Sequence, residues 1–242
     1  MQVALVTGVS RGLGEALARV LLDRGYEVVG IGRHDSPRLA HPKYRFVGHD
    51  LADVDGIDAA LGATMQQIAA RVPASVSLVN NAAVAAPAGA IGQIDAGEIA
   101  RALAVNLAAP AAVANLFCRH FASAPGDRRI VNVSSGAAHS VLAGSAMYCA
   151  AKAGLEMLTR VIAAEQGAEG IRAVSLRPGI LDTDMQLFMR SQPGSVLPTV
   201  AMFQGFHDSG QLVQPDTAAA RIADRIIAGA IEQGRQYSYS EL

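Results

Sequence analysis

Tyr148 and Lys152 stand four residues apart at the start of a predicted helix, residues 145–168. Side chains with this spacing project from the same helix face, one turn apart. An ammonium group beside a phenol favours the phenolate and lowers the pKa of the phenol from its usual value of about 10. A tyrosine tuned in this way can act as a general acid or base near neutral pH. The alternative is an ordinary surface pair, because Tyr-x-x-x-Lys is an unspecific pattern by itself.

A pair of serines precedes this helix in the sequence. Ser134 and Ser135 directly follow an apolar run, residues 128–133, that we expect to form a strand. Open α/β sheets bind their ligands at the carboxyl ends of the parallel strands. A serine hydroxyl at that edge can donate a hydrogen bond to a substrate carbonyl oxygen. The alternative is a capping or turn role, which is common for serine.

A glycine-rich segment, residues 7–14, lies between an apolar run at residues 2–6 and a helical pattern at residues 12–24. A buried strand, a glycine turn and a helix N-terminus in that order form a phosphate cradle. Glycine lets the backbone approach the ligand closely, and the free N–H groups of the helix attract the anion. This context favours nucleotide binding over a purely structural turn. A Walker A loop is disfavoured, because no Gly-Lys-Ser/Thr ends the segment.

Short apolar runs alternate with longer helical patterns along the whole chain, which is typical of a parallel sheet with crossover helices. We expect strands at residues 2–6, 26–31, 43–47, 76–80, 128–133 and 171–177, with a weak seventh at 235–239. We expect helices at residues 12–24, 53–71, 95–121, 145–168 and 215–233. The predicted fold class is therefore α/β, a single Rossmann-type doubly wound parallel sheet of about seven strands with helices on both faces.

One long stretch, residues 182–212, shows no regular pattern and carries several prolines and glycines. A structureless segment of this length in a compact domain is usually a functional lid or a disordered loop. We favour a substrate-binding lid, because methionine and phenylalanine side chains such as Met185, Phe188 and Met189 give it apolar surface with which to close.

Composition limits the function classes. The 242 residues are 51% hydrophobic and 17% charged, which suits one large α/β domain over residues 1–242. A net charge of -1 without a basic stripe argues against a nucleic-acid partner. Two cysteines, Cys118 and Cys149, predict no disulfide framework. No uninterrupted apolar stretch approaches the roughly 20 residues of a membrane span, and we expect no signal peptide. We therefore expect a cytoplasmic protein without a membrane partner or a metal site.

Six motifs occur in the order and spacing of the short-chain dehydrogenases/reductases, a family that the chain resembles over essentially its whole length. The motifs are Thr7-Gly8-x-x-x-Gly12-x-Gly14, Asn80-Asn81-Ala82-Ala83, Asn106, Ser135, Tyr148-x-x-x-Lys152 and Pro178-Gly179-x-x-x-Thr183. The resemblance implies the strand order 3-2-1-4-5-6-7. Its one departure is Ala83, where the family usually carries glycine.

The resemblance implies four catalytic residues. Tyr148 would donate a proton to a carbonyl oxygen, Ser135 would orient that carbonyl, and Lys152 would bind the nicotinamide ribose and tune Tyr148. Asn106 would hold a water molecule of the proton relay. The residues expected to bind the dinucleotide are Gly8, Ser10, Arg11, Gly12, Leu13, Gly14, Arg33, Asp50, Leu51, Asn80, Ala82, Tyr148, Lys152, Pro178, Gly179 and Thr183.

The end of the second predicted strand bears on the choice between NAD and NADP. An acidic side chain there would bind the ribose 2′-hydroxyl and repel a 2′-phosphate. In this chain Gly32 takes the acidic position and Arg33 follows, whose guanidinium can bind a phosphate. Arg11 could supply a second cation. We therefore expect NADP(H), used in the reductive direction. The alternatives are that both arginines are solvated and that Asp35 acts as an NAD-type acid.

The expected substrate is a small molecule that carries a carbonyl group. Candidate contact residues are Ser135, Ala137, His139, Leu142, Met185 and Met189. This pocket would be mostly apolar and would suit a hydrophobic or aromatic ketone. The segments around Ser135, Tyr148 and Pro178 also resemble bacterial benzil reductases, sepiapterin-reductase-like members that reduce a 1,2-diketone.

Two other functions stay open: reduction of 3-oxoacyl thioesters on a carrier protein, and non-catalytic NADP(H) sensing. The first would need a basic docking patch, which Arg101, Arg128 and Arg129 do not clearly form.

The helix at residues 145–168 is apolar on more than one side. By family resemblance this predicts a homodimer or a tetramer built partly on that helix.

Overall fold

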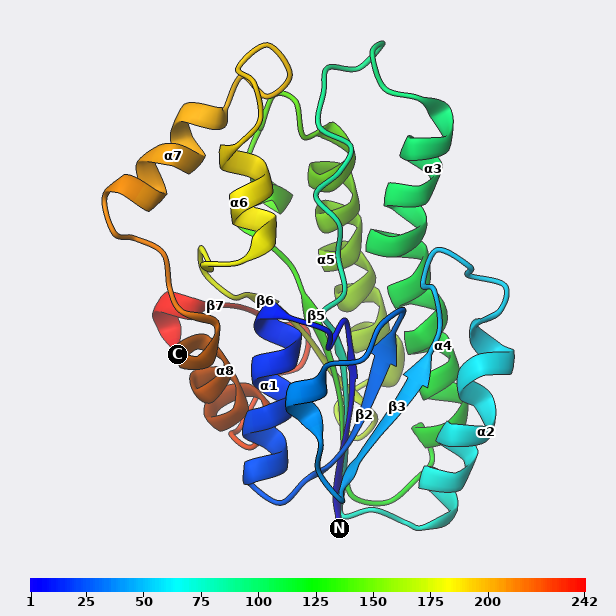
Figure 1. Ribbon diagram of the computed structural model, residues 1–242. Coiled ribbons are helices and arrows are strands. Elements are labelled where there is room, and N and C mark those ends of the chain that lie inside the picture. The colour runs from blue at the N-terminus through cyan, green and yellow to red at the C-terminus, as the bar shows by residue number, and fades with distance from the viewer.

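A computed structural model describes residues 1–242, and all seven strands of the chain join one parallel sheet (Figure 1). The strands are β1 (Gln2–Thr7), β2 (Glu27–Gly32), β3 (Tyr44–Gly48), β4 (Ser75–Asn80), β5 (Asp127–Val133), β6 (Arg172–Arg177) and β7 (Gln236–Ser238). Their order is β3-β2-β1-β4-β5-β6-β7, which confirms the predicted fold. Each strand begins and ends within one residue of its predicted bounds.

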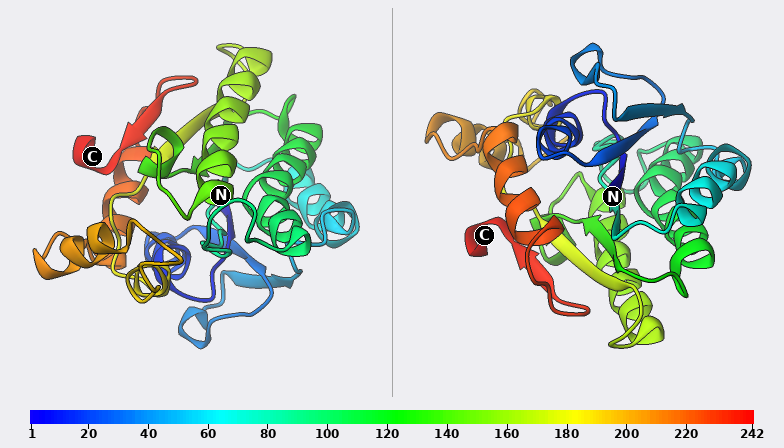
Figure 2. Two further views of the ribbon diagram at one scale, coloured as in Figure 1. Left: turned by 90° about the horizontal axis from the view of Figure 1, so that it is seen from above. Right: turned by 90° about the horizontal axis from the view of Figure 1, so that it is seen from below.

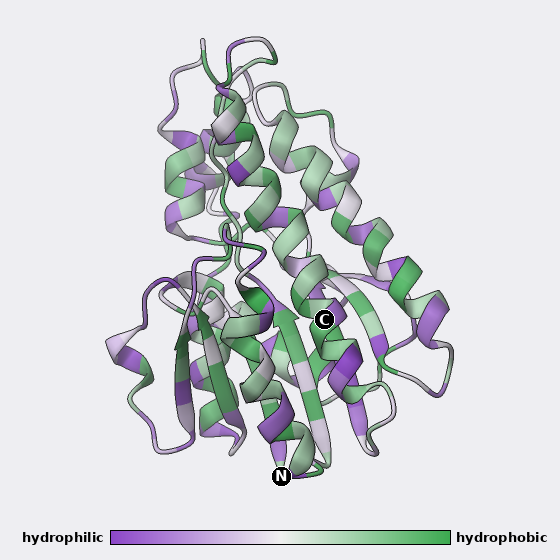
Figure 3. Ribbon diagram, turned by 90° about the vertical axis from the view of Figure 1, so that its right-hand side faces the viewer, coloured by the Kyte–Doolittle hydropathy of each residue, from purple (hydrophilic) through white to green (hydrophobic).

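The central strands read as continuous apolar runs because both faces of the sheet are covered. In β1 and β4 every residue after the first is buried. The edge strand β3 contains no buried residue and β7 is only half-buried. Figure 3 shows the same distribution, with apolar residues along the central strands and hydrophilic ones on outward-facing helix turns and loops.

Helices lie on both faces of the sheet, as predicted. The helices are α1 (Gly12–Asp23), α2 (Ile57–Ala70), α3 (Ala96–Leu103), α4 (Ala109–Phe121), α5 (Ala146–Gln166), α6 (Asp184–Arg190), α7 (Val200–Asp208) and α8 (Pro215–Ile222), with the π-helical turns η2 (Ala104–Ala108) and η4 (Ala223–Ile227) and the 3-10 turns η1 (Pro37–Leu39), η3 (Gly136–His139) and η5 (Tyr239–Glu241). One face is covered by α1 and α8, and the other by α2, α4 and α5 (Figure 2).

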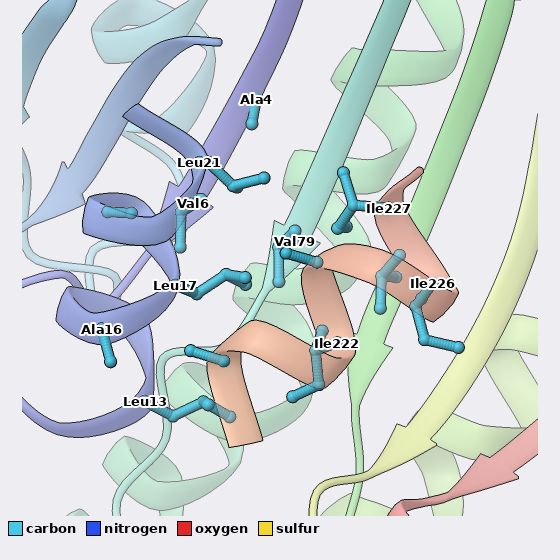
Figure 4. Close-up of a cluster of buried hydrophobic side chains, with 14 of the residues drawn as sticks. Ala4, Val6, Leu13, Ala16, Leu17, Leu21, Val79, Ile222, Ile226 and Ile227 are labelled. Carbon is cyan, nitrogen blue, oxygen red and sulfur yellow. The ribbon is translucent and has the colours of Figure 1, made fainter. Parts of the chain in front are cut away.

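Each face has its own hydrophobic core. On the first face Leu17 and Leu21 of α1 pack with Ile222 of α8 above the sheet (Figure 4). On the second face Phe117 and Phe121 of α4 lie with their ring centroids 4.6 Å apart, fully buried. Burial of a side chain of this size contributes about 1.5–3 kcal/mol, so these two cores hold α1 and α4 firmly against the sheet.

The helix predicted at residues 95–121 is interrupted. It forms α3, the π-helical turn η2 and α4, which together make a continuous helical run, Ala96–Phe121. By length and composition this run could cross a membrane, so the expectation that no such stretch exists was wrong. Its largest apolar side chains, Phe117 and Phe121, are buried in the core beside the sheet. The apolar composition therefore serves the interior of the fold.

The stretch 182–212 was predicted to be irregular, and this was wrong, because it contains α6 and α7. The two short helices are tied together by Gln186, whose amide donates to the carbonyl oxygen of Phe203 at 2.8 Å. They lie above the carboxyl ends of the strands (Figure 1).

The helix predicted at 215–233 is shorter than expected. Helix α8 passes into η4, which ends at Ile227. There Arg129 donates hydrogen bonds to the carbonyl oxygens of Ile226 and Gly229.

Candidate active site

A cleft of about 900 Å³ runs along the carboxyl edge of the sheet. This volume lies in the range of small-molecule sites. Its walls come from the glycine segment, the ends of β2, β4 and β5, the first turns of α5 and the segment that leads from β6 into α6. Residues expected to bind a dinucleotide that line the cleft are Gly8, Ser10, Arg11, Gly12, Leu13, Arg33, Asp50, Leu51, Ala82, Tyr148, Lys152, Pro178 and Thr183.

The glycine segment has the geometry of an anion cradle. Gly8 and Gly12 have φ values of +74° and +61°, which glycine adopts without strain. The N-cap residue of α1 is Arg11, and its side chain makes no capping bond, so the first N–H groups of the helix are free of side-chain partners. These groups and the positive end of the helix dipole face the cleft, where they fit a pyrophosphate.

Gly14 lies behind the cradle and does not line the cleft. A Cβ atom on this residue would stand 2.1 Å from the carbonyl oxygen of Gly8 and 2.5 Å from Nδ2 of Asn81. The third glycine of the motif therefore allows the helix to approach the preceding turn, which is the packing role that the motif predicts.

The cradle is fastened to the strand beside it by two side chains of the predicted motifs, Thr7 and Asn81, to which the sequence assigned no individual role. Oγ1 of Thr7 accepts hydrogen bonds from the backbone N–H groups of Asn81 and Ala82, at 2.9 and 3.0 Å. The amide of Asn81 donates to the carbonyl oxygen of Thr7 at 2.9 Å. Asn81 therefore fixes the turn that carries Gly8. Its place in an Asn-Asn pair at the end of a strand was the available signal.

Lys152 is buried beneath the cleft, with 2% of its surface exposed. Its Nζ donates to the carbonyl oxygen of Val133 at 2.7 Å and lies 5.6 Å from the ring centroid of Tyr148. Burial lowers the pKa of Lys152 to about 8, because removal from water penalises the ammonium form. The predicted helical pair thus exists, and it lies inside the molecule rather than on its surface.

The pKa of Tyr148 shifts in the opposite direction to the one predicted from its spacing to Lys152. Burial raises this pKa, and the nearby Ser135 hydroxyl offsets the rise only in part. Tyr148 is therefore a neutral phenol at neutral pH, the form that can donate a proton. Oγ of Ser135 accepts a hydrogen bond from the backbone N–H of Ala137 at 3.2 Å, as the N-cap of η3.

Comparison with known proteins also shows to which family the chain belongs. Residues 2–194 match the short chain dehydrogenase family. The chain belongs to the short-chain dehydrogenases. It is 32% identical to a benzil reductase ((S)-benzoin forming) of Bacillus subtilis (strain 168), over all of this chain and 99% of the relative. This similarity confirms the resemblance to benzil reductases and supports an oxidoreductase that acts on carbonyl groups.

Solved structures of short-chain dehydrogenases share the fold over nearly the whole chain. The KRED1-Pglu enzyme superposes with a TM-score of 0.85 at 28% identity, covering 98% of this chain and 100% of that one. A short chain dehydrogenase from Burkholderia cenocepacia J2315, solved in complex with NADP, has a TM-score of 0.76 at 26% identity, covering 98% of this chain and 95% of that one.

Two of the residues carried over from the family have different surroundings from those expected. Asn80 does not line the cleft; it is buried between strands, where its amide donates to Oδ1 of Asn132 at 2.8 Å. Asn106 lies in the π-helical turn η2, and both ends of its side-chain amide bind the backbone of Val84, each at 2.8 Å. The side chain of Asn106 therefore positions the segment after β4, and its expected role in holding a water molecule stays a prediction.

The end of the cleft near β2 is lined by Gly32 and Arg33. Arg33 lines the cleft, is exposed and makes no salt bridge. Asp35 accepts hydrogen bonds from the Tyr44 hydroxyl at 2.6 Å and from the Ser36 backbone at 2.7 Å. Asp50 forms a salt bridge with Arg101 at 3.0 Å. The pKa of Asp50 is lowered mainly by the hydrogen bond from the backbone N–H of Ala52, and Arg101 lowers it further.

Elsewhere the cleft lining includes the apolar side chains Val84, Leu181, Met185 and Phe188, together with the acidic Asp182 and Asp184 of the same segment as Leu181 and Met185. Of the predicted substrate residues only Met185 lines the cleft directly. The cleft lining does not include Ser135, Ala137, His139, Leu142 or Met189; Ser135 lies near Tyr148, and His139 bonds to Glu156. Gly179 also lies outside and packs beside Tyr239, whereas Thr183 packs over Gly12. Arg11 reaches across to Asp184 at 3.2 Å and links the cradle to α6.

Proposed function

We propose that this short-chain dehydrogenase is an NADPH-dependent reductase of apolar ketones or 1,2-diketones, with Tyr148 as the general acid. The observation that carries the proposal is the arrangement of Tyr148: a neutral phenol on the cleft wall, near the Ser135 hydroxyl and beside the buried Lys152. These groups stand at the carboxyl edge of the sheet, where the cleft also contains a cradle that fits a pyrophosphate and the apolar side chains Val84, Leu181, Met185 and Phe188, which can contact a hydrophobic carbonyl compound.

The protein's part in the reaction follows from these residues. The bound reduced nicotinamide supplies the hydride that forms the new C–H bond. Ser135 donates a hydrogen bond to the carbonyl oxygen and sets its position. Tyr148 transfers its proton to that oxygen as the C=O bond becomes a C–O single bond, which yields the alcohol. Lys152, next to the ring of Tyr148, stabilises the phenolate until a proton from solvent restores the phenol.

The preference for NADP(H) is argued from charge at the end of β2. Gly32 offers no carboxylate, and the carboxylate of Asp35 does not line the cleft and is held through Oδ1 by Tyr44 and Ser36. Arg33 is the free cation on this wall, and its planar guanidinium suits a phosphate dianion.

The test is oxidation of NADPH, followed by absorbance, with benzil as the substrate. We expect turnover by the wild type and a loss of about 10²–10⁴-fold for Tyr148→Phe, the usual contribution of general acid catalysis. Binding of NADPH, measured by fluorescence titration, should be nearly unchanged in that variant. Arg33→Ser should weaken NADPH binding and leave NADH binding unaffected. Equal affinity of the wild type for NADH and NADPH would refute the charge argument.

The two other functions are distinguished by the same assay. A 3-oxoacyl-thioester reductase would need basic residues near the mouth of the cleft to dock an acidic carrier protein. Arg129 is instead buried near the amino ends of the strands, and Arg128 binds backbone carbonyl groups there. A non-catalytic NADP(H) sensor would bind NADPH tightly and turn over none of the ketones, diketones or thioesters.

We also propose a homodimer built on α5, as in the earlier expectation, with a tetramer as the alternative. The outer face of α5 exposes Met157 to 53% and Val161 to 44%, with the small residues Ala153 and Ala164 exposed on the same helix. Exposed apolar side chains on a long helix mark a surface that another subunit can cover. The cytoplasmic location stays a prediction.

A further inference from the structure

Glu156 has no part in the mechanism above, yet it lies one helical turn beyond Lys152 on α5 and is buried, with 6% of its surface exposed. Its carboxylate collects hydrogen bonds from three side chains. Ser134 donates to Oε1 at 2.7 Å, and Arg177 donates to Oε1 at 3.1 Å and to Oε2 at 3.3 Å. Nε2 of His139 lies 2.5 Å from Oε2.

The three partners belong to segments that carry active-site residues. Ser134 immediately precedes Ser135, and His139 ends the 3-10 turn η3 that begins just after Ser135. Arg177 is the last residue of β6 and directly precedes Pro178, which lines the cleft. One carboxylate thus fastens both sides of the turn that presents Ser135, and the same group holds the start of the segment after β6.

The cluster needs a carboxylate rather than a neutral side chain of the same shape. Burial alone would raise the pKa of Glu156, but the hydrogen bonds from Arg177, Ser134 and His139 outweigh it and lower this pKa, so the group is ionised at neutral pH. An ionised carboxylate accepts at both oxygens. A glutamine would offer one oxygen and one NH2 group, and the NH2 group would face donors.

We propose that Glu156 is the positioning residue that fixes the Ser135 turn against Tyr148 and couples it to the segment after β6. Glu156 acts through Ser134 and His139 and does not itself touch the substrate. This inference rests on the proposed carbonyl reduction. It predicts that the carboxylate contributes to turnover by holding Ser135, beyond any contribution to the stability of the fold.

The test is a double-mutant cycle on kcat with Glu156→Gln and Ser135→Ala. A misplacement of about 1 Å at a reacting group costs on the order of 10²-fold in rate, so we expect a loss near that size for Glu156→Gln. The same substitution should cost only a few-fold in the Ser135→Ala background, because Ser135 is then absent. NADPH affinity, measured by fluorescence, should change much less than kcat.

Asp127→Asn is the matched control. Asp127 is also a partly buried carboxylate that binds two arginines, Arg129 and Arg172, but it lies at the amino ends of the strands, away from the cleft. This variant should lower stability and leave kcat unchanged. If Glu156→Gln does not fold, Ser134→Ala removes one donor and keeps the carboxylate, and the same cycle is run with it.

The outcomes separate the two proposals. A wild type that reduces no carbonyl compound refutes the proposed function and this inference with it. With an active wild type, two results overturn the inference alone: a folded Glu156→Gln variant with wild-type kcat, or an equal loss of kcat with and without the Ser135 hydroxyl.

Discussion

Replacement of Gly14 by alanine tests whether the turn at the head of α1 is the cofactor cradle. The added Cβ atom would lie 2.1 Å from the carbonyl oxygen of Gly8, whereas non-bonded carbon atoms pack at about 3.5–4.0 Å. The turn that carries Gly8 must therefore move by about 1 Å or more. Neither clashing group is a flexible side-chain end: one is backbone and the other is the amide of Asn81, which is held by Thr7.

Two costs follow from this displacement. Overpacking of this kind destabilises a protein by about 1–3 kcal/mol. The hydrogen bond from Asn81 to the Gly8 carbonyl oxygen, 3.3 Å long, is lost in addition and contributes about 1 kcal/mol. We therefore expect the free energy of unfolding of Gly14→Ala to fall by about 2–4 kcal/mol. A shift of the cradle should also weaken NADPH binding by an order of magnitude or more.

The assay combines urea unfolding with a fluorescence titration of NADPH. Gly62→Ala is the control, because Gly62 lies in the interior of α2 and a Cβ atom there would meet nothing within 4 Å. Alanine at this position should raise stability by about 0.5–1 kcal/mol and leave NADPH binding unchanged. A Gly14→Ala protein that is as stable as the wild type and binds NADPH equally well would refute the reasoning.

The remaining predictions concern a buried amine and an exposed helix face. The folded-state pKa of Lys152 is about 8 against an ordinary 10.5, so between these pH values the unfolded chain binds the extra proton and stability rises with pH. The rise should total about 3 kcal/mol and be absent in Lys152→Met, as measured by urea unfolding across this range; equal pH profiles would contradict it. On α5, Met157→Glu should convert the proposed dimer to monomers in sedimentation velocity, whereas Met202→Glu on α7 should not; an unchanged mass distribution would argue against that interface.

The fold could be predicted from the sequence because its signals are local. The strands β1 and β4 are nearly continuous apolar runs, and α1 repeats buried leucines at helical spacing through Leu13, Leu17 and Leu21. The glycine motif could be interpreted in the same way, since strand, turn and helix follow one another within 14 residues. Helix ends were predicted less accurately where hydrogen bonds from residues far away in the sequence determine them. At η4 the terminating bonds come from Arg129, nearly 100 residues away in the chain.

The parts of the site that could not be predicted depend on tertiary contacts. Asn80 and Asn81 are adjacent and chemically identical, and the direction of the chain at the end of β4 decides that Asn81 binds the cradle while Asn80 binds Asn132. The π-helical turn at Asn106 coincides with its two bonds to Val84 across 22 residues. His139 was expected to contact the substrate, and its bond to Glu156 could not be foreseen because that partner lies 17 residues further along the chain.

The pKa of Tyr148 bears on the role of this residue in the reaction. Spacing alone suggested that Lys152 would make Tyr148 a phenolate, which suits a base that accepts a proton from an alcohol. In the folded protein burial disfavours both charged forms, so the pKa of Lys152 falls to about 8 and that of Tyr148 rises. A phenol that is protonated at rest is ready to donate, and reduction of a carbonyl group consumes that proton. The protonated resting state of Tyr148 thus matches the general-acid role that we propose for it.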